Sequence, residues 1–287
     1  MRGHFGWAFA SVVSAGLSGL GGALAADLPV KAPLIVPVVY NWTGCYVGVN
    51  GGWKGGRFRE SADTPAGVAV IPGVASTPFA ADHIDLGRLN ADSGAVGGQL
   101  GCRWETASHW VFGAEGDFDW TDLHGTITET RPGTGNSVFI PGDYYDNRAR
   151  WQSSVRGIVG RSFDKWLVYG TGGLAITNVT MTGNYIAAVV GGQAFPASVG
   201  SDSKTLYGFT VGVGAAYAFA KNWDVGAEYR YSQYNGADFG LGQVAAVCFR
   251  GTCTNTSVTG HKDLTTQEVL VKLNYRFTTG GAVVAKY

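Results

Sequence analysis

Apolar and polar residues alternate with a period of two in several segments of the chain. In residues 110–120, aromatic side chains occupy one parity, and three carboxylates, Glu115, Asp117 and Asp119, occupy the other. Because successive side chains of a strand point to opposite faces, this pattern predicts a strand with one apolar and one polar face. Further clear strands are predicted at residues 205–219, 223–233 and 265–277, and weaker ones at 42–53, 93–104, 148–161 and 166–178. The last of these is apolar and glycine-rich on both faces, so its orientation stays open.

The connections between these eight strands are alternately long and short. The long connections are residues 54–92, 121–147, 179–204 and 235–264, and the short ones are 105–109, 162–165 and 220–222. A membrane barrel has this rhythm, with short periplasmic turns, long external loops and both chain ends on the periplasmic side. We therefore predict an all-β fold, an eight-stranded antiparallel up-and-down transmembrane β-barrel.

Composition favours a membrane barrel over a soluble one. Charged residues make up 15% of the 287 residues and aromatic residues 13%, and glycine occupies 45 positions. A lipocalin-like barrel would have to enclose the aromatic stripe and would need more charge on its outer face. In a membrane barrel, aromatic residues near the strand ends form girdles at the level of the lipid headgroups. The net charge is zero, so no basic surface points to nucleic acid as a partner.

The N-terminal residues are typical of an export signal. A basic start, an apolar run over residues 5–20 and the sequence Ala23-Leu24-Ala25 fit a cleaved signal peptide, and the alternative is an amphipathic helix that stays attached. Three prolines at four-residue spacing follow, which favours an extended segment. The predicted organisation is a signal peptide at residues 1–25, a Pro-rich periplasmic leader at 26–41, the outer-membrane barrel at 42–277 and a short C-terminal tail at 278–287.

Four segments carry a resemblance to a known family. They are residues 26–33 (ADLPVKAP), 41–52 (NWTGCYVGVNGG), 167–175 (LVYGTGGLA) and 273–277 (LNYRF). The chain resembles the small outer-membrane immunogenic, or opacity-porin-like, β-barrel proteins of alphaproteobacteria. This resemblance implies an eight-stranded barrel in the cell outer membrane, acting as a surface antigen, in envelope integrity or in porin-like permeability, without catalytic residues.

The final predicted strand ends in Tyr275 and Phe277, two residues apart. This ending resembles the signal by which the barrel-assembly machinery recognises its clients, so that machinery is an expected partner. The signal often ends a chain, whereas residues 278–287 follow here. Either the machinery tolerates the tail, or the alternation of Val283, Ala285 and Tyr287 supplies part of the signal.

The polar parity of the strands predicts a charged lumen. Its members are expected to point inward as six positive and six negative side chains: Arg103, Arg150, Arg156, Arg230, Lys272 and Arg276 with Glu115, Asp117, Asp119, Asp224, Glu228 and Glu268. Side chains can fill an eight-stranded barrel, and unpaired buried charges are costly, so we expect close ion pairs across the lumen. Two interpretations follow: a plug that holds the barrel rigid, or a narrow conductive path that opens when the pairs rearrange.

Enzymatic and metal sites have little support. Some eight-stranded outer-membrane barrels modify lipid A with a histidine and a serine near a strand end. Here His83, His124 and His261 lie in predicted loops and His109 in a turn, and none has a serine two residues further on. No C-x-x-C or H-x-x-x-H spacing indicates a metal site. We predict no enzymatic activity, no metal and no cofactor.

The four cysteines would lie in an oxidising compartment after export. Cys248 and Cys253 flank a four-residue segment of the last predicted loop, and we expect a disulfide between them. Cys45 and Cys102 lie near the periplasmic ends of neighbouring strands. A bridge between them and two free cysteines packed against lipid are both open interpretations.

The predicted function is structural or surface-interacting: an integral outer-membrane barrel whose lumen is largely plugged by ion pairs. The alternative is a small porin for passive diffusion of ions and small solutes. Outer-membrane lipid and lipopolysaccharide are expected partners, and no external ligand can be named. The stretches at residues 62–81 and 180–200, which carry almost no charge, suit either an interaction surface or mobile segments that touch one another or lipopolysaccharide.

Overall fold

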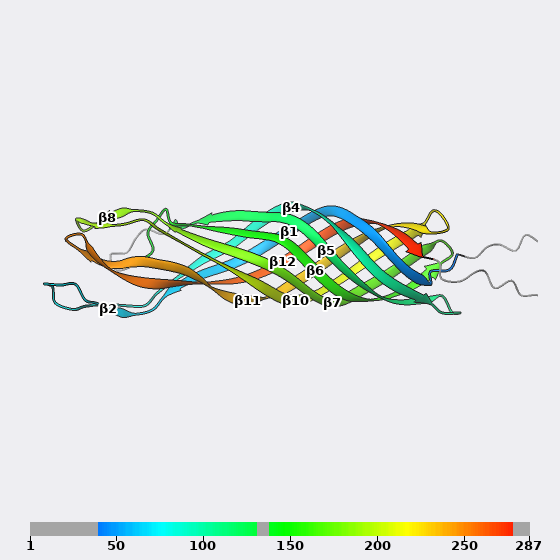
Figure 1. Cartoon of the computed structure of the whole chain (residues 1–287), viewed down its shortest axis with the longest axis horizontal. Coiled ribbons are helices and arrows are strands. Elements are labelled where there is room, and N and C mark those ends of the chain that lie inside the picture. Colours follow the sequence, from blue (N-terminus) through cyan, green and yellow to red (C-terminus); the bar gives the residue numbers. More distant parts are fainter. Residues whose placement is uncertain (1–39, 131–137, 278–287) are drawn as a thin grey trace, which may run out of the picture. The chain divides into compact units, whose positions relative to one another are not determined.

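Eight long antiparallel strands close into a ring in the order β1-β12-β11-β10-β7-β6-β5-β4 (Figure 1). The computed structural model describes residues 40–130 and 138–277. The strands of the ring are β1 Gly44–Thr64, β4 Asp82–Glu105, β5 Trp110–Thr128, β6 Tyr144–Phe163, β7 Trp166–Tyr185, β10 Ser198–Ala218, β11 Trp223–Phe249 and β12 Thr252–Phe277. The predicted eight-stranded antiparallel barrel is confirmed. The predicted signal peptide, most of the leader and the C-terminal tail lie outside the described residues.

Two small hairpins lie in the connections between ring strands. β2 (Gly67–Ala69) pairs with β3 (Thr77–Phe79), and β8 (Ala188–Val190) pairs with β9 (Gln193–Phe195). Within residues 40–130 and 138–277, no helix is long and apolar enough to cross a membrane.

The two ends of the barrel differ. The turn end carries the short connections at 106–109, 164–165 and 219–222, together with the start of β1 and the end of β12. The loop end carries β2, β3, β8 and β9 (Figure 1). The connection expected at 235–264 is instead a tight turn between β11 and β12, where Arg250 and Gly251 both have positive φ, at 51° and 84°. Two consecutive positive φ angles match the twist of the flanking strands in a tight hairpin. Glycine adopts positive φ without strain, which explains why a glycine occupies position 251.

In the half of the barrel near the turn end, the outward-facing side chains are apolar. We call this band the apolar belt; its exposed members include Val47, Val49, Trp53, Val96, Leu100, Phe112, Phe118, Trp120, Val155, Val159, Val168, Leu174, Phe209, Val211, Val213, Tyr229, Val269 and Val271. The inward side chains at the same height are polar. This arrangement is the one that a lipid environment requires.

Beyond the belt, the two faces exchange their character. On β1, Phe58 and Ala62 are fully buried in the lumen, whereas Arg57 and Arg59 point outward. The ring strands have 19 to 27 residues, against the ~9 to 11 that a tilted membrane crossing needs. We call this part the loop-end extension: it has an apolar interior and a polar outer wall, as a soluble barrel does. The period-two pattern reverses its phase at this boundary, which is why the sequence predicted only the belt half of each strand.

A bulge on β6 corrects one predicted site residue. The pairing of β6 with β7 shifts register between Ala149 and Gln152, and both of these side chains point into the lumen. The extra residue of a bulge changes which parity faces inward. Arg150, predicted to point inward, is therefore exposed on the outer wall.

Candidate functional site

Eleven of the twelve side chains predicted to line the lumen are buried, each no more than 6% exposed; the twelfth is Arg150. The eleven are Arg103, Glu115, Asp117, Asp119, Arg156, Asp224, Glu228, Arg230, Glu268, Lys272 and Arg276. They come from five of the eight ring strands, β4, β5, β6, β11 and β12. The candidate site is therefore the lumen at the height of the apolar belt.

Arg156 on β6 binds carboxylates from two sides of the lumen. Its Nη2 lies 2.6 Å from Glu115 Oε1 and 2.8 Å from Asp117 Oδ2, both on β5. Its Nη1 donates to Glu228 on β11, a strand separated from β6 by β7 and β10 in the ring. A planar guanidinium with several donors suits this bridging of separate carboxylates. The contacts of one side chain thus cross the lumen.

Arg230 on β11 repeats this arrangement from the opposite wall. Its Nη1 lies 3.2 Å from Asp117 Oδ1, 3.2 Å from Asp119 Oδ2 and 3.5 Å from Glu268 Oε2. Asp117 is consequently shared by Arg230 and Arg156, so the two guanidiniums belong to one continuous network.

A lysine and two tyrosines complete the contacts of the glutamates. Lys272 on β12 binds Glu115 and lies 3.1 Å from Glu228 Oε2. The Tyr46 hydroxyl donates to Glu115 Oε2 at 2.6 Å, and the Tyr169 hydroxyl donates to Glu228 Oε2 at 3.1 Å. Buried carboxylates need several such donors because each loses its hydration.

The sequence prediction missed Lys54. In the structure this lysine, and not Arg150, is the sixth cation of the lumen at the height of the apolar belt. Its side chain is buried, its Nζ lies 3.2 Å from Glu268 Oε1, and it also donates to Gln152. The predicted first strand stopped one residue earlier, at Trp53, although the inward parity that includes Asn50 continues to Lys54. With Lys54 included, six cations still face six carboxylates.

An apolar layer lies at the turn end of the lumen. Arg103 lies 3.6 Å from Asp224 Oδ2, and its guanidinium covers the Tyr46 ring at 4.1 Å. The fully buried Trp42, which precedes β1, lies beside Arg103. We call the surrounding cluster the turn-end core; it comprises Trp42, Val111, Ile158, Leu167, Tyr169, Ala216 and Ala218.

Arg276 is buried but forms no ion pair with a carboxylate among the described residues. Its Nη2 donates to the Lys221 carbonyl at 3.1 Å, its Nη1 donates to the Asn41 carbonyl, and its guanidinium covers the Tyr40 ring at 4.4 Å. Arg276 therefore holds the segment before β1 against the turn end, which is a role that the charge pattern did not indicate.

A larger apolar cluster fills the lumen of the loop-end extension. We call it the loop-end core; its buried members include Phe58, Ala62, Ile84, Leu123, Phe139, Tyr145, Val179, Met181, Leu206, Phe239, Leu241, Val258 and Leu264. Phe139 belongs to the connection between β5 and β6 and is only 3% exposed. The charged layer thus lies between two apolar layers, whereas the sequence predicted only charged and polar side chains in the lumen.

One ion pair lies inside the loop-end core. Lys262 Nζ lies 3.6 Å from Glu60 Oε1 and donates to Asn147. Burial lowers the pKa of Lys262 to about 8, against the opposing effect of Glu60. Burial likewise raises the pKa of Glu60, and the charge of Lys262 only partly offsets this. Burial therefore disfavours the charged form of both side chains relative to the neutral form.

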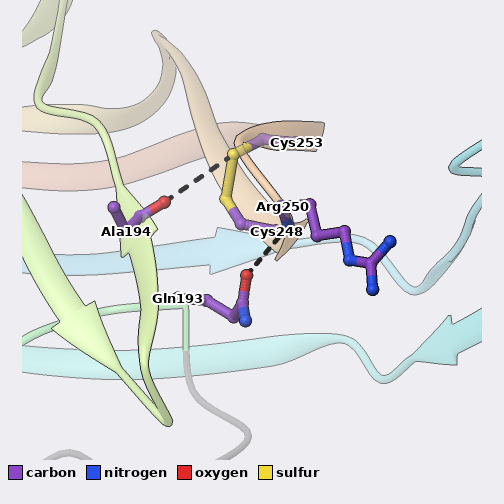
Figure 2. The surroundings of a disulfide bond; sticks show 5 residues. All are labelled: Gln193, Ala194, Cys248, Arg250 and Cys253. Carbon is purple, nitrogen blue, oxygen red and sulfur yellow. Dashed lines mark hydrogen bonds between the residues drawn. A yellow bond between two sulfur atoms is a disulfide. The ribbon is translucent and has the colours of Figure 1, made fainter.

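Both cysteine pairs form disulfides. Cys45 and Cys102 are directly opposite each other on β1 and β4, with their Cα atoms 3.9 Å apart. Cys248 and Cys253 join the two strands at the β11–β12 turn. Figure 2 shows the second disulfide beside β9, where the Arg250 amide donates to Gln193 Oε1 at 3.0 Å. This disulfide therefore lies where the hairpin contacts a neighbouring connection.

The histidine positions differ from their prediction. His83, His124 and His261 were expected in loops, but they lie in β4, β5 and β12 and point outward from the loop-end extension. His83 Nδ1 lies 2.6 Å from Asp63 Oδ1, and the other two also lie near aspartates. In the described part of the chain, no group of three or more His, Cys, Asp or Glu side chains could hold a metal ion.

Tyr275 and Phe277 end β12 on its outward face. Their rings lie 5.4 Å apart in an edge contact, and Tyr275 also contacts Trp223 at 5.1 Å. These residues belong to the aromatic rim of the turn end. Their role as an assembly signal stays a prediction.

Comparisons with known proteins agree with this architecture. Residues 18–277 match the family described as outer membrane protein beta-barrel domain. A 31 kDa outer-membrane immunogenic protein of Brucella melitensis is 32% identical over 267 residues, covering 89% of this chain and 93% of that protein. A 22 kDa outer membrane protein of Rhizobium leguminosarum is 31% identical over 147 residues, covering 50% and 56%.

Among solved structures, the outer membrane protein OprG from Pseudomonas aeruginosa aligns with a TM-score of 0.39 and 9% identity, over 83% of this chain and 99% of that one. The sequence comparisons confirm the family resemblance and the location. The chain belongs to the outer membrane protein β-barrel family and is an outer-membrane protein.

Proposed function

We propose that this barrel has a structural and surface-interaction role in the outer membrane and that its lumen is closed to ions. The observation that carries the proposal is the sequence of three layers in the lumen. The charged layer lies between the turn-end core and the loop-end core. An ion crossing the lumen would have to displace both apolar layers as well as the paired charges between them.

The energetic argument depends on the two apolar layers. A hydrated ion that enters an apolar constriction loses water contacts without gaining polar partners, which is costly. In the charged layer, Arg156 and Arg230 each contact several carboxylates. Opening a path there would leave buried charges without partners, at about 3 to 5 kcal/mol for each broken pair.

The proposal includes the absence of enzymatic activity. Asp238, His261 and Ser61 lie side by side on neighbouring strands of the outer wall. This is the order of the acid, the base and the nucleophile in a serine catalytic triad. His261 Nδ1 lies 2.8 Å from Asp238 Oδ1, but no hydrogen bond links Ser61 to His261 among the described residues. Nucleophilic catalysis needs that second contact to activate the hydroxyl. The row is better explained as a polar surface ladder.

The surface role is supported by the relatives and by the loop end. The relative from Brucella is named an outer-membrane immunogenic protein, a name that fits a surface role. Here the loop end exposes Val68 and Val70 near β2, and Val189 in β8. Exposed apolar side chains of this kind are typical of interaction surfaces.

The test is planar-bilayer conductance of the refolded protein. Insertion is established first by a mobility shift on heating and by protease resistance of the strands. We expect no discrete conductance steps from inserted protein. Reproducible steps in salt would instead support the small porin, which is the alternative function. A second arm compares the detergent sensitivity of cells with and without the protein, where the structural role predicts higher sensitivity without it.

A further inference from the structure

A polar groove runs up the outer wall from the edge of the apolar belt. Its lower part, of about 330 Å³, is lined by Trp53, Arg57 and Tyr231 among others. Its upper part, of about 500 Å³, shares Arg57 and Tyr231 and adds Arg59 and Arg88. The two parts therefore form one concavity across the outer faces of β11, β12, β1 and β4.

Three arginines gather along this groove. Arg59 on β1 lies directly opposite Arg88 on β4, and Arg57 is two residues below Arg59 on the same face. Among the described residues, neither Arg59 nor Arg88 forms an ion pair, and Arg57 only donates to Asn90 Oδ1 at 3.2 Å. Like charges directly opposite on neighbouring strands repel each other. An anion between them would remove that repulsion.

Two aspartates lie near these arginines, so their effect has to be counted. Asp263 on β12 lies opposite Arg59 on β1. Asp92 on β4 is two residues closer to the belt than Asn90 and points to the same face. In the described part of the chain, neither forms an ion pair with an arginine of the groove; Asp263 Oδ1 instead lies 4.0 Å from His261 Nε2. Three cations and two anions leave the groove with a net positive charge.

The height of the arginines indicates the kind of ligand. A strand rises about 3.3 Å per residue and is tilted by ~35–45°, so Arg57 lies roughly 10 Å above Trp53, and Arg59 and Arg88 roughly 15 Å above it. The headgroup layer of a phospholipid is only about 5 to 8 Å thick on each side. A phosphorylated sugar headgroup is larger and reaches this far.

The rest of the groove suits a sugar. Its wall presents hydroxyl and amide groups beside the arginines and just below them: Asn90, Tyr231, Gln233, Asn235, Thr265 and Gln267. Such groups donate to and accept from sugar hydroxyls. Below them, Trp53 folds over Gly55, whose Cβ position would meet the ring at 2.7 Å, so the apolar belt begins directly under the polar wall.

We propose that this groove binds the phosphorylated sugar headgroup of an outer-leaflet glycolipid, with Arg57, Arg59 and Arg88 holding its phosphates. Guanidinium groups bind phosphate through paired, charge-assisted hydrogen bonds. The acyl chains of the same molecule would lie on the apolar belt beside Trp53. This binding site lies on the outer wall, so it does not depend on whether the lumen is closed to ions.

The test measures binding of deep-rough lipopolysaccharide to the refolded full chain in an uncharged maltoside detergent, by native mass spectrometry. The same lipopolysaccharide after removal of its phosphates, and inorganic phosphate alone, are the comparison ligands. The test variant is R59Q/R88Q. The matched control is R161Q/R250Q, which removes equal charge from two outward arginines at the turn end and at the β11–β12 tip. A heat-dependent mobility shift shows that each variant is folded.

We expect R59Q/R88Q to bind lipopolysaccharide about tenfold more weakly than the wild type, and R161Q/R250Q to bind it as the wild type does. Equal binding by the wild type and R59Q/R88Q would overturn the site. Undiminished binding of the dephosphorylated lipid would overturn the role of phosphate. Competition by inorganic phosphate at similar concentration would overturn the assignment to a lipid, because a free anion would then suffice.

Discussion

Arg156 is one of the residues that join opposite walls of the charged layer. It contacts Glu115 and Asp117 on β5 and Glu228 on β11. Replacing it with methionine keeps much of the volume but leaves these carboxylates with less positive charge. We expect R156M to lower the free energy of unfolding by about 3 to 5 kcal/mol, measured by urea titration in lipid vesicles.

Two further variants make this prediction specific. R161M removes an exposed arginine from the same strand and should change stability by less than about 0.5 kcal/mol. R156M/E228M removes both partners of one pair, so its cost should be smaller than the sum of the two single costs. Additive costs would show that the pair contributes no coupling.

The Glu60–Lys262 pair predicts a pH dependence in the loop-end extension. Because burial lowers the pKa of Lys262 to about 8, the unfolded chain holds the proton that the folded chain has lost between pH ~8 and ~10.5. The free energy of unfolding should therefore gain up to about 3 kcal/mol from this lysine across that window. Glu60 titrates at lower pH. Because its pKa is raised in the folded chain, the folded chain keeps its proton longer, and the free energy of unfolding falls as pH rises above ~4.5.

The measurement compares urea unfolding of the wild type and E60Q/K262M from pH 8 to 10.5. The difference between the two should grow in favour of the wild type as pH rises, since the variant lacks the titrating lysine. A constant difference across the window would contradict the lowered pKa of Lys262.

At the residue scale, the sequence predicted most of the lumen because parity is a strict rule within one regular strand. It misplaced Arg150 because a bulge changes parity, and residues 149–152, where the register shifts, contain no glycine or proline that would indicate one. It missed Lys54 because the predicted strand ended at the boundary of the belt. Trp42 was assigned to the first strand, and no pattern indicated that it enters the lumen.

Among the elements, the two disulfides are expected to contribute differently. The Cys45–Cys102 bridge closes a separation of 57 residues, and the Cys248–Cys253 bridge closes only 5. The entropy that a cross-link removes from the unfolded chain grows with loop length, giving about 4 and about 2 kcal/mol, respectively. C45S/C102S should therefore destabilise the barrel more than C248S/C253S in urea unfolding.

Hydrogen exchange distinguishes the local effect of the second bridge. The Arg250 amide binds Gln193 Oε1 beside that disulfide (Figure 2), so C248S/C253S should speed exchange at Arg250 while C45S/C102S leaves it unchanged. A larger global loss from C248S/C253S would refute the ranking by loop length.

The strands were predicted in the right number and order, but at about half their length. The belt half of each strand shows apolar residues on the outward parity, and the loop-end extension shows them on the inward parity. A search for one continuous alternation stops where the phase reverses. The sequence therefore assigned residues such as Phe58 and Leu264 to loops, although they pack in the loop-end core.

For the whole molecule, the arrangement of layers links stability to the closed lumen. The belt requires an apolar outside, and the charged layer inside it is stable only when its members are paired. The extension has the opposite requirement because water surrounds it. One chain meets both conditions by exchanging the faces of its strands at the upper edge of the belt. A consequence is that the lumen is apolar at the loop end, where the loop-end core lies.

This layering predicts that no single substitution opens the barrel. Trp42 is fully buried in the turn-end core, and W42A should lower the free energy of unfolding by about 3 to 5 kcal/mol through lost burial and a cavity. The charged layer and the loop-end core stay in place, so folded W42A should remain silent in planar bilayers. Discrete conductance steps from W42A alone would show instead that the turn-end core is the barrier to ions and that the charged layer conducts.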